Sequence, residues 1–337
     1  MRGDTRTDRV FSGIQPSGEV HVGNYLGAIR NWIGMLDRHD CIFCIVDLHA
    51  ATIEYDPKEM PRRILDAAIT NIACGLDPER CTLFVQSAVP AHAELCWMFM
   101  TVAPMGDLGR MTQFKDKSEL HRHNVNAGLF AYPVLQAADI MLYKATRVPV
   151  GEDQLQHLEL CREIARRFNA RYGPVFPEAD AVIGAVRRVL GLDGQAKMSK
   201  SLGNHLGVLE PPEEILRKLR PAFTDPQRLR LSDPGRPEVC NVFTMHGGFT
   251  PPDQVAEIDC NCRSALWGCT DCKMVLAHHM LEDLTPIRER AAELRARPEE
   301  VIEILDAGAE RCRAIARETM AEVREAMGLR LAPGTPG

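Results

Sequence analysis

Two lysines in one short polar segment carry the clearest chemistry of this 337-residue chain. The segment is Lys197-Met198-Ser199-Lys200-Ser201, called the lysine loop below, and both ammonium groups could reach the β- and γ-phosphates of a bound ATP. Such charges stabilise pyrophosphate as it leaves, and the formation of an adenylate needs this electrostatic work more than it needs an acid or a base. The alternative interpretation is a basic loop on the surface.

A second candidate phosphate site lies near the N-terminus, over residues 11–24. A short apolar strand runs there into a turn with Gly13, Gly18 and Gly23, and a helix begins beyond it. Glycine allows the backbone to approach a ligand closely, and the free N–H groups of a helix start attract anions. We therefore expect His21 and Asn24 to lie beside a nucleotide. The alternative is a purely structural glycine turn.

The segment 148–157 opens a helix at the end of a short strand. Ligands bind at such positions in doubly wound sheets, and the side chains of Asp153 and Gln154 could hold an α-ammonium group. The alternative is an acidic helix start that only suits the helix dipole.

Asp139 is a lone carboxylate within an apolar helical segment, residues 128–141. Burial of an unpaired carboxylate costs several kcal/mol, so a donor must satisfy it. The donor is either a ligand or a partner elsewhere in the fold.

Four cysteines form a candidate metal site, with the spacing Cys240-x21-Cys262-x6-Cys269-x2-Cys272. Four thiolates suit a [4Fe-4S] cluster or a structural zinc ion. Zinc usually takes two close Cys-x2-Cys pairs and only one is present, so we expect the iron–sulfur cluster, with zinc and free buried thiols as alternatives. Cys260 is a rival for the position of Cys262, which we prefer.

Short apolar runs at 9–14, 41–47, 82–86 and 148–150 indicate strands buried on both faces of a sheet, and amphipathic helices separate them. This alternation predicts an α/β fold, a doubly wound parallel-sheet (Rossmann-type) nucleotide-binding catalytic domain over residues 1–190. Residues 191–207 form the lysine loop and a linker. Residues 208–330 form a smaller helical domain, with separate helices over 298–305 and 309–327, and residues 331–337 a disordered tail.

The composition is ordinary for a globular protein, with 45% hydrophobic and 26% charged residues. The net charge of −6 excludes a bulk polycation, so a nucleic-acid partner needs a local footprint. No apolar run approaches the ~20 residues of a membrane span, and the N-terminus lacks the apolar core of a signal peptide. We expect a cytoplasmic protein that does not associate with membranes.

Six segments carry a family resemblance when they are read together. They are Phe-Ser-Gly-Ile-Gln-Pro-Ser-Gly (11–18), Cys-Ile-Val-Asp-Leu-His-Ala (44–50), Arg-Met-Thr-Gln-Phe-Lys-Asp-Lys (110–117), Tyr-Pro-Val-Leu-Gln-Ala-Ala-Asp (132–139), Val-Gly-Glu-Asp-Gln (150–154) and the lysine loop. The set resembles the bacterial tryptophanyl-tRNA synthetases, which are class I enzymes. Asn24 stands where the usual class I motif has its second histidine, a replacement that is also similar to this family.

The resemblance implies a role for each matching residue. The implied catalytic residues are Lys197, Lys200, Lys117 and Gln15. The implied ATP-binding residues are Gln15, Ser17, Gly18, His21, Gly23, Asn24, Gly151, Asp153, Lys197, Met198, Ser199, Lys200 and Ser201. The implied tryptophan-binding residues are Phe11, Gly13, His49, Tyr132, Gln136, Asp139, Val148, Val150, Asp153 and Gln154, with Asp139 as acceptor of the indole N–H.

The resemblance also implies substrates and partners: ATP with Mg²⁺, L-tryptophan, the tryptophan tRNA and a second copy of the chain in a homodimer. A subset of the family carries a [4Fe-4S] cluster, and the first spacing here is one residue shorter than in that subset, a change that a loop can absorb. Two other functions are compatible with parts of the pattern. They are a non-aminoacylating RNA-binding or iron/redox-responsive regulator and an adenylyltransferase.

Overall fold

The computed structural model describes residues 8–16, 18–114, 119, 123–184, 189–200 and 202–330. The expectations for Ser17, Lys117, Ser201 and the tail 331–337 lie outside these residues. The described chain contains a five-stranded parallel sheet in the order β3-β2-β1-β4-β5. The strands are β1 (Arg9–Ile14), β2 (Asp40–Ile45), β3 (Thr82–Val85), β4 (Arg147–Val150) and β5 (Asp180–Ile183). The α/β class predicted from the sequence is confirmed.

Strand β2 shows why the strands are almost continuously apolar. Cys41, Phe43 and Ile45 belong to the hydrophobic core on one face of the sheet, whereas Ile42 and Cys44 belong to the core on the other face. Successive side chains of a strand point to opposite faces, so a sheet covered by helices on both sides needs apolar residues at every position. The edge strand β5 is only half-buried. The strand was not predicted from the sequence, because its apolar pattern is weaker than that of the other strands.

The direction of the strand order reverses between β1 and β4. From β1 the chain moves outward to β2 and β3, and it then returns to β4 on the other side of β1. The hydroxyl of Ser12 on β1 donates to the carbonyl oxygen of Pro149 on β4 at 3.2 Å. Ligands bind outside the carboxyl ends of two such strands, where the connections diverge. The glycine turn follows β1 at this edge, and Gly151 follows β4 there.

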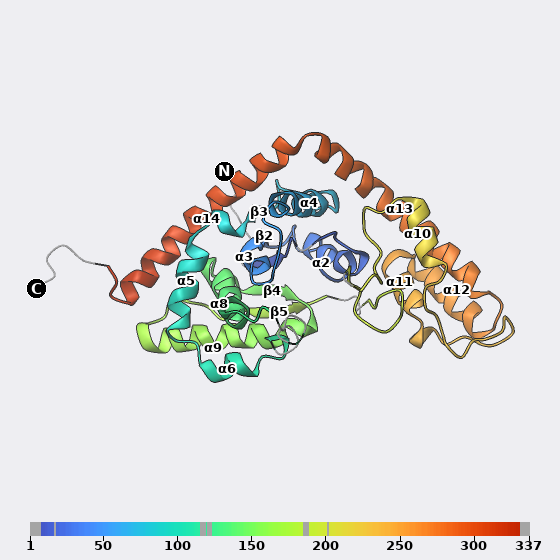
Figure 1. Ribbon diagram of the computed structural model, residues 1–337, viewed down its shortest axis with the longest axis horizontal. Coiled ribbons are helices and arrows are strands. Elements are labelled where there is room, and N and C mark those ends of the chain that lie inside the picture. The colour runs from blue at the N-terminus through green and yellow to red at the C-terminus, as the bar shows by residue number, and fades with distance from the viewer. Residues whose placement is uncertain are drawn as a thin grey trace, which may run out of the picture.

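Helices cover both faces of the sheet (Figure 1). The helical stretch after β1 consists of α1 (Val22–Asn24), a π-helical turn η1 (Tyr25–Ile29) and α2 (Arg30–Ile33). Three short turns are η2 (Gln86–Ala88), η3 (Glu152–Gln154) and η4 (Pro237–Val239). The other helices are α3 (Asp47–Ala50), α4 (Met60–Ala73), α5 (Ala91–Met100), α6 (Met105–Arg110), α8 (Ala127–Leu142), α9 (Leu155–Tyr172), α10 (Pro212–Leu219), α11 (Asn241–Phe249), α12 (Pro252–Arg263), α13 (Cys269–Ala296) and α14 (Pro298–Ala326).

The last helix does not stay with the helical part of the chain. In Figure 1, α13 and α14 meet above α4, and α14 then crosses the sheet domain beside β3. Its buried residues Ala309, Cys312 and Met320 belong to the same hydrophobic core as Ile42 and Cys44 of β2. Residues 208–330, which were predicted to form one helical domain, thus contribute α14 to the packing of the sheet, whereas α10 and α11 pack on α13. The glycine at 308 leaves α14 continuous, although two helices were expected there.

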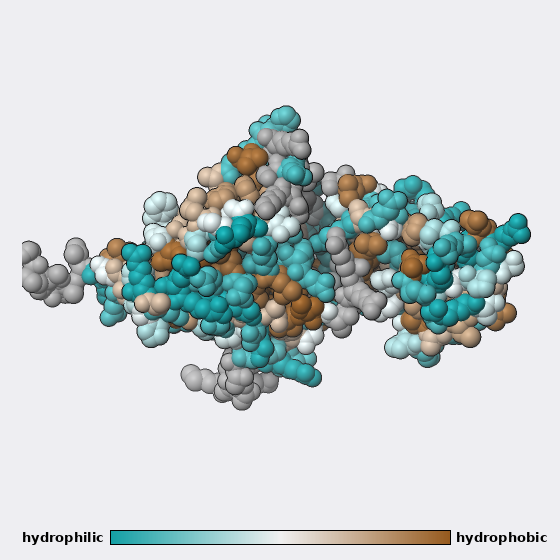
Figure 2. Space-filling model, turned by 90° about the horizontal axis from the view of Figure 1, so that it is seen from below, coloured by the Kyte–Doolittle hydropathy of each residue, from teal (hydrophilic) through white to brown (hydrophobic). Residues whose placement is uncertain are grey.

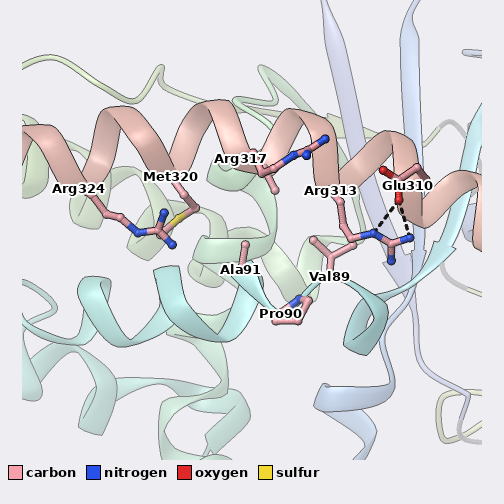
Figure 3. A pocket seen from close by; sticks show the side chains of 9 residues that line it. Val89, Pro90, Ala91, Glu310, Arg313, Arg317, Met320 and Arg324 are labelled. Atoms are coloured by element: carbon pink, nitrogen blue, oxygen red, sulfur yellow. Dashed lines mark hydrogen bonds and ion pairs between the residues drawn. The ribbon is translucent and has the colours of Figure 1, made fainter. Parts of the chain in front are cut away.

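Helix α14 is attached to α5 and to η2 by polar contacts around a cavity of about 420 Å³ (Figure 3). Arg324 forms an ion pair with Glu94 at 2.7 Å, and Arg313 donates to the carbonyl oxygen of Ala88 at 2.9 Å. The apolar side chain of Met320 lines the cavity between them. These contacts fix the end of the chain against the sheet domain.

No helix of the described residues is long and apolar enough to cross a membrane. The face of the molecule in Figure 2 carries hydrophilic residues over most of its area, with smaller hydrophobic patches among them.

Gly308 allows α14 to approach the sheet, and its replacement tests this packing. A Cβ atom at this position would overlap the backbone carbonyl of Leu83 on β3, so Gly308→Ala must push the helix away. We expect a loss of about 1–3 kcal/mol in the free energy of unfolding, measured with urea. Gly247→Ala on α11 is the control, because nothing lies within 4 Å of its Cβ position. Equal stability of the two variants would contradict the packing argument.

Candidate active site and cysteine centre

The lysine loop lies against the glycine turn because the chain that follows the loop pairs with it. The N–H of Val22 donates to the carbonyl oxygen of Leu206 at 2.8 Å, and the N–H of Val208 donates to that of Val20 at 2.9 Å. All four residues are buried, so the pairing belongs to the hydrophobic core. Two motifs far apart in the sequence therefore meet in space.

Two glycines of the turn face side chains of the loop directly. A Cβ atom at Gly18 would stand 3.5 Å from the side chain of Lys200, and one at Gly23 would stand 3.5 Å from Met198. Met198 is buried, whereas the side chains of Lys197 and Lys200 are exposed. The loop is thus anchored by its methionine and presents both ammonium groups to the solvent beside the turn.

His21 and Asn24 cap the helix start reciprocally. The backbone N–H of Asn24 donates to Nδ1 of His21 at 3.2 Å, and the backbone N–H of His21 donates to Oδ1 of Asn24 at 3.3 Å. Burial, together with the charges of His205 and Lys197, lowers the pKa of His21 to about 4. The ring is neutral at pH 7, and since Nδ1 accepts a hydrogen bond, its proton is on Nε2. His21 therefore offers one neutral N–H donor.

Asp153 connects the segment after β4 to the lysine loop. Its Oδ2 lies 3.5 Å from Nζ of Lys197. Burial alone would raise the pKa of Asp153, but the charge of Lys197 and the hydrogen bonds from Gln154 and Lys197 outweigh it, and the pKa is lowered. A Cβ atom at Gly151 would stand only 2.6 Å from Oδ1 of Asp153, so glycine leaves room for this carboxylate.

The buried side chain of Asn204, which was not predicted from the sequence, holds the backbone of the lysine loop. Its Oδ1 accepts the N–H of Ser199 at 2.8 Å, and its Nδ2 donates to Asp193 at 2.9 Å and to the carbonyl oxygen of Lys197 at 3.4 Å. Asn204 is buried against Gly191, where a Cβ atom would overlap its amide. The only sequence signal for Asn204 was its position, as an uncharged polar residue three positions after the end of the lysine loop.

Asp139 has its partners within the fold. Oδ2 lies 2.7 Å from Nε2 of His49, while Oδ1 lies 2.7 Å from Nε2 of Gln86 and 2.7 Å from Nδ1 of His92. Burial alone would raise the pKa of Asp139, but the contacts with His49 and His92 outweigh it and hold the pKa below its usual range. One of the two alternatives is thus observed, a carboxylate satisfied by the protein. Gln86 and His92 were not predicted.

The other residues implied for the amino-acid pocket gather around this carboxylate or lie in the core next to it. The hydroxyl of Tyr132 lies 2.8 Å from Nε2 of His157, and its ring meets that of His49 edge-on at 6.3 Å. Phe11 is buried and stacks on Tyr143 at 5.5 Å, within the same core as Val148. The side chains of Gln15, Gln136, Val150 and Gln154 are half-buried.

The four predicted cysteines line one small cavity between α11, α12 and α13, and they are called the cysteine centre below. Nη1 of Arg228 lies 3.8 Å from Sγ of Cys262 and 3.9 Å from Sγ of Cys269. Cys260 is exposed and does not line the cavity, which favours Cys262. Burial and the neighbouring thiols raise the pKa of Cys272 to about 12.

Comparison with known proteins identifies the family. The family described as tRNA synthetases class I (W and Y) matches residues 4–284. A tryptophan–tRNA ligase of Deinococcus radiodurans is 50% identical over 325 residues, covering 95% of this chain and 98% of the relative. A tryptophan–tRNA ligase of Wolinella succinogenes is 45% identical, with 95% and 98% covered. This chain belongs to the class I tRNA synthetases for tryptophan and tyrosine.

Solved structures agree with this family. A tryptophanyl-tRNA synthetase of Campylobacter jejuni, complexed with ADP and tryptophan, has a TM-score of 0.83 at 34% identity and covers 95% of this chain and 99% of its own. The enzyme of Mycoplasma pneumoniae has a TM-score of 0.84 at 31% identity, with 96% and 98% covered. Within the family this chain is a tryptophan–tRNA ligase, as the motifs predicted.

The protonation of His21 is testable by NMR. We expect the C2 proton of its ring to keep one chemical shift from about pH 8 to pH 5.5, because the folded pKa lies near 4 rather than 6.5. The unfolded chain binds more protons between about pH 6.5 and pH 4, so this group lowers the stability as the pH falls through that window. The resonance is assigned by its loss in His21→Gln. A midpoint near 6.5 in the folded protein would refute the neutral ring.

Proposed function

We propose that this enzyme binds L-tryptophan and ATP in the crevice between β1 and β4 and acts in two steps. The tryptophan carboxylate attacks the α-phosphorus, the bond to the bridging oxygen breaks, and pyrophosphate leaves with its electron pair. The 2′-hydroxyl of the terminal adenosine of the tRNA then attacks the carbonyl carbon of the adenylate, and AMP leaves. The observation that carries this proposal is the contact of the lysine loop with the glycine turn and with Asp153.

The lysines are free to move from their present partner to a phosphate. The side chains of Lys197 and Asp153 are 55% and 41% exposed, and an ion pair so open to water contributes little. A triphosphate in the crevice replaces this weak partner, and Lys200 reaches it from the side of Gly18. Both charges then stabilise the leaving pyrophosphate. A Mg²⁺ ion bound to the ATP would supply further positive charge beside the phosphates.

His21 and the glycine turn hold the nucleotide without adding charge. The neutral Nε2–H of His21 donates to a nucleotide oxygen, and Asn24 keeps the ring in this orientation through Nδ1. Since the ring stays neutral, it does not compete with the lysines for the negative charge that develops on the leaving group. Gln15 follows β1 at the same edge and contributes a further polar contact.

Asp139 supports selection of tryptophan from the floor of the pocket. Its Oδ2 carries one protein contact, from His49, and a carboxylate oxygen can accept a second. The indole N–H supplies it, while His49 and Tyr132 flank the ring. A site with a buried acceptor rejects an aromatic ring that lacks the donor, by ~10⁴-fold in related cases. His92 and Gln86 keep the carboxylate in place from the other oxygen.

Two exposed apolar residues on α5 support a homodimer. Trp97 is 70% exposed and Met100 is 40% exposed, three positions apart on one helix face. Met105 at the start of α6 is 71% exposed. A second copy of the chain would remove these surfaces from water, and the tryptophan tRNA would then cross between the two subunits.

The cysteine centre supports an iron–sulfur cluster better than a zinc ion. Its four thiols line one small cavity and contain a single Cys-x2-Cys pair, whereas a zinc ion usually takes two such pairs. Four thiolates suit a four-iron cluster. Cys240, Cys262, Cys269 and Cys272 would hold the [4Fe-4S] cluster, which supplies a rigid crosslink between α11, α12 and α13.

The role of the lysine loop predicts a selective defect. We expect Lys200→Ala to slow ATP–pyrophosphate exchange by ~10²–10³-fold, because one charge on the leaving group is lost. The KM for tryptophan changes less than about twofold, because the amino acid binds elsewhere. Lys58→Ala, an exposed lysine before α4, is the control and keeps the exchange rate. Wild-type exchange in Lys200→Ala would overturn the assignment.

The identity of the metal is tested on protein purified without oxygen. We expect a brown protein that absorbs near ~400 nm and contains about four iron atoms per chain. Cys262→Ser should lose the colour, and Cys260→Ser should keep it, because only Cys262 lines the cavity. A colourless protein with one zinc ion per chain would show that the centre holds zinc.

A further inference from the structure

The lysine loop begins on the second arm of a hairpin, residues 190–200, called the lysine hairpin. Leu190 and Lys197 form an antiparallel bridge, and the N–H of Gly191 donates to the carbonyl oxygen of Ala196 at 2.8 Å. The positions of Lys197 and Lys200 therefore depend on what fixes Leu190 and Gly191 at its base.

One buried side chain, Asn241, holds the base of the hairpin. Its Oδ1 accepts the N–H of Leu190 at 3.2 Å, and its Nδ2 donates to the carbonyl oxygens of Leu190 at 3.1 Å and Gly191 at 2.9 Å. Asn241 is 5% exposed, so water cannot replace these contacts. Backbone groups shielded from water need partners, and this single amide pairs three of them, one in a buried hydrogen bond and two in part-buried ones.

Asn241 is also covalently attached to the cysteine centre. It is the first residue of α11, and the residue before it, Cys240, lines the cysteine cavity and is 8% exposed. One peptide bond thus separates a sulfur ligand of the proposed cluster from the amide that holds the lysine hairpin.

A second connection runs through Phe223. Its N–H donates to the carbonyl oxygen of Leu192 at 2.7 Å, and its ring fills the space where Gly194 lacks a Cβ atom. The next two residues, Thr224 and Asp225, line the cysteine cavity. In addition to the contacts of Asn204, the residues Asn241 and Phe223 therefore bind the hairpin at two points, and each of these two residues is next in sequence to a residue of the cavity wall.

We propose that Asn241 is a positioning residue for adenylate formation, and that the cysteine centre controls through it where Lys197 and Lys200 lie. The proposal depends on the role of these lysines stated above. A metal group that joins Cys240 to Cys262, Cys269 and Cys272 restricts the backbone at the start of α11 and so keeps the amide of Asn241 under the hairpin. With the centre empty or broken, Cys240 loses its link to the other three cysteines, and the hairpin opens more often.

The first experiment removes the amide. We expect Asn241→Ala to speed hydrogen exchange at the amides of residues 190–200 by ~10- to 100-fold, because the three hydrogen bonds of the buried amide are lost. The kcat of ATP–pyrophosphate exchange falls by ~10-fold or more, while the KM for tryptophan stays within about twofold. Asn241→Asp keeps the acceptor and the side-chain volume and is used if the alanine variant does not fold.

The control for this experiment is a second asparagine whose side-chain amide also holds backbone groups, but at a distance from the lysine hairpin in the sequence. Asn169 on α9 holds a loop through three similar hydrogen bonds, to Val175 and Phe176. Asn169→Ala should leave the exchange of residues 190–200 and the kcat unchanged. Unchanged hairpin exchange in both Asn241 variants would overturn the proposal, and so would a KM for tryptophan that rises as much as the kcat falls.

The second experiment breaks the cysteine centre at a distance from Asn241. We expect Cys262→Ser to speed exchange over residues 190–200, and Cys260→Ser to leave it as in the wild type. Protection that is the same in Cys262→Ser and wild type would show that the centre does not control the hairpin. A failed lysine assignment remains distinguishable, because Lys200→Ala would then retain pyrophosphate exchange while the hydrogen exchange of these variants still reports on the hairpin.

Discussion

Two backbone hydrogen bonds between Val20–Val22 and Leu206–Val208 bring the chemistry of this enzyme together. They lie in the hydrophobic core, so their geometry is set by packing and not by charge. Lys197 and Lys200, which precede Leu206 in the chain, remain exposed. The result is a loop with buried ends and free ammonium groups, which suits charges that must follow a phosphate as it departs.

The amino-acid side of the crevice has the opposite design. Asp139, His49, His92 and Gln86 form a buried polar network in which each carboxylate oxygen is paired. Such a network is rigid when all its members are satisfied, because an unpaired buried group costs more than the hydrogen bond gains. Under the proposed function, one part of the site is thus preorganised for recognition, while the other keeps mobile charge for the chemistry.

The helical half is linked to both parts of the catalytic domain. Helix α13 begins at Cys269 in the cysteine centre and packs on α4, and α14 continues across β3. Gly308 permits this last contact, because a larger residue would meet the backbone of β3. The same chain therefore connects the cysteine centre to the sheet and, through Asn241, to the lysine hairpin. Cys240 is connected to the lysine hairpin by one peptide bond and the hydrogen bonds of Asn241.

Local pattern determined much of this protein: the apolar runs of β1 to β4, the α/β class, and the positions of the two motifs proposed to bind phosphate and of the four spaced cysteines. These follow from neighbouring residues, because side-chain period and turn chemistry act over a few positions. Tertiary structure alone decided that β5 completes the sheet, that α14 returns to it, and that Asp139 is paired within the fold. It also selected Asn204 and Asn241 as the residues that hold the lysine hairpin. Their partners lie on other elements, and a hydrogen bond between distant segments has no local signature in the sequence.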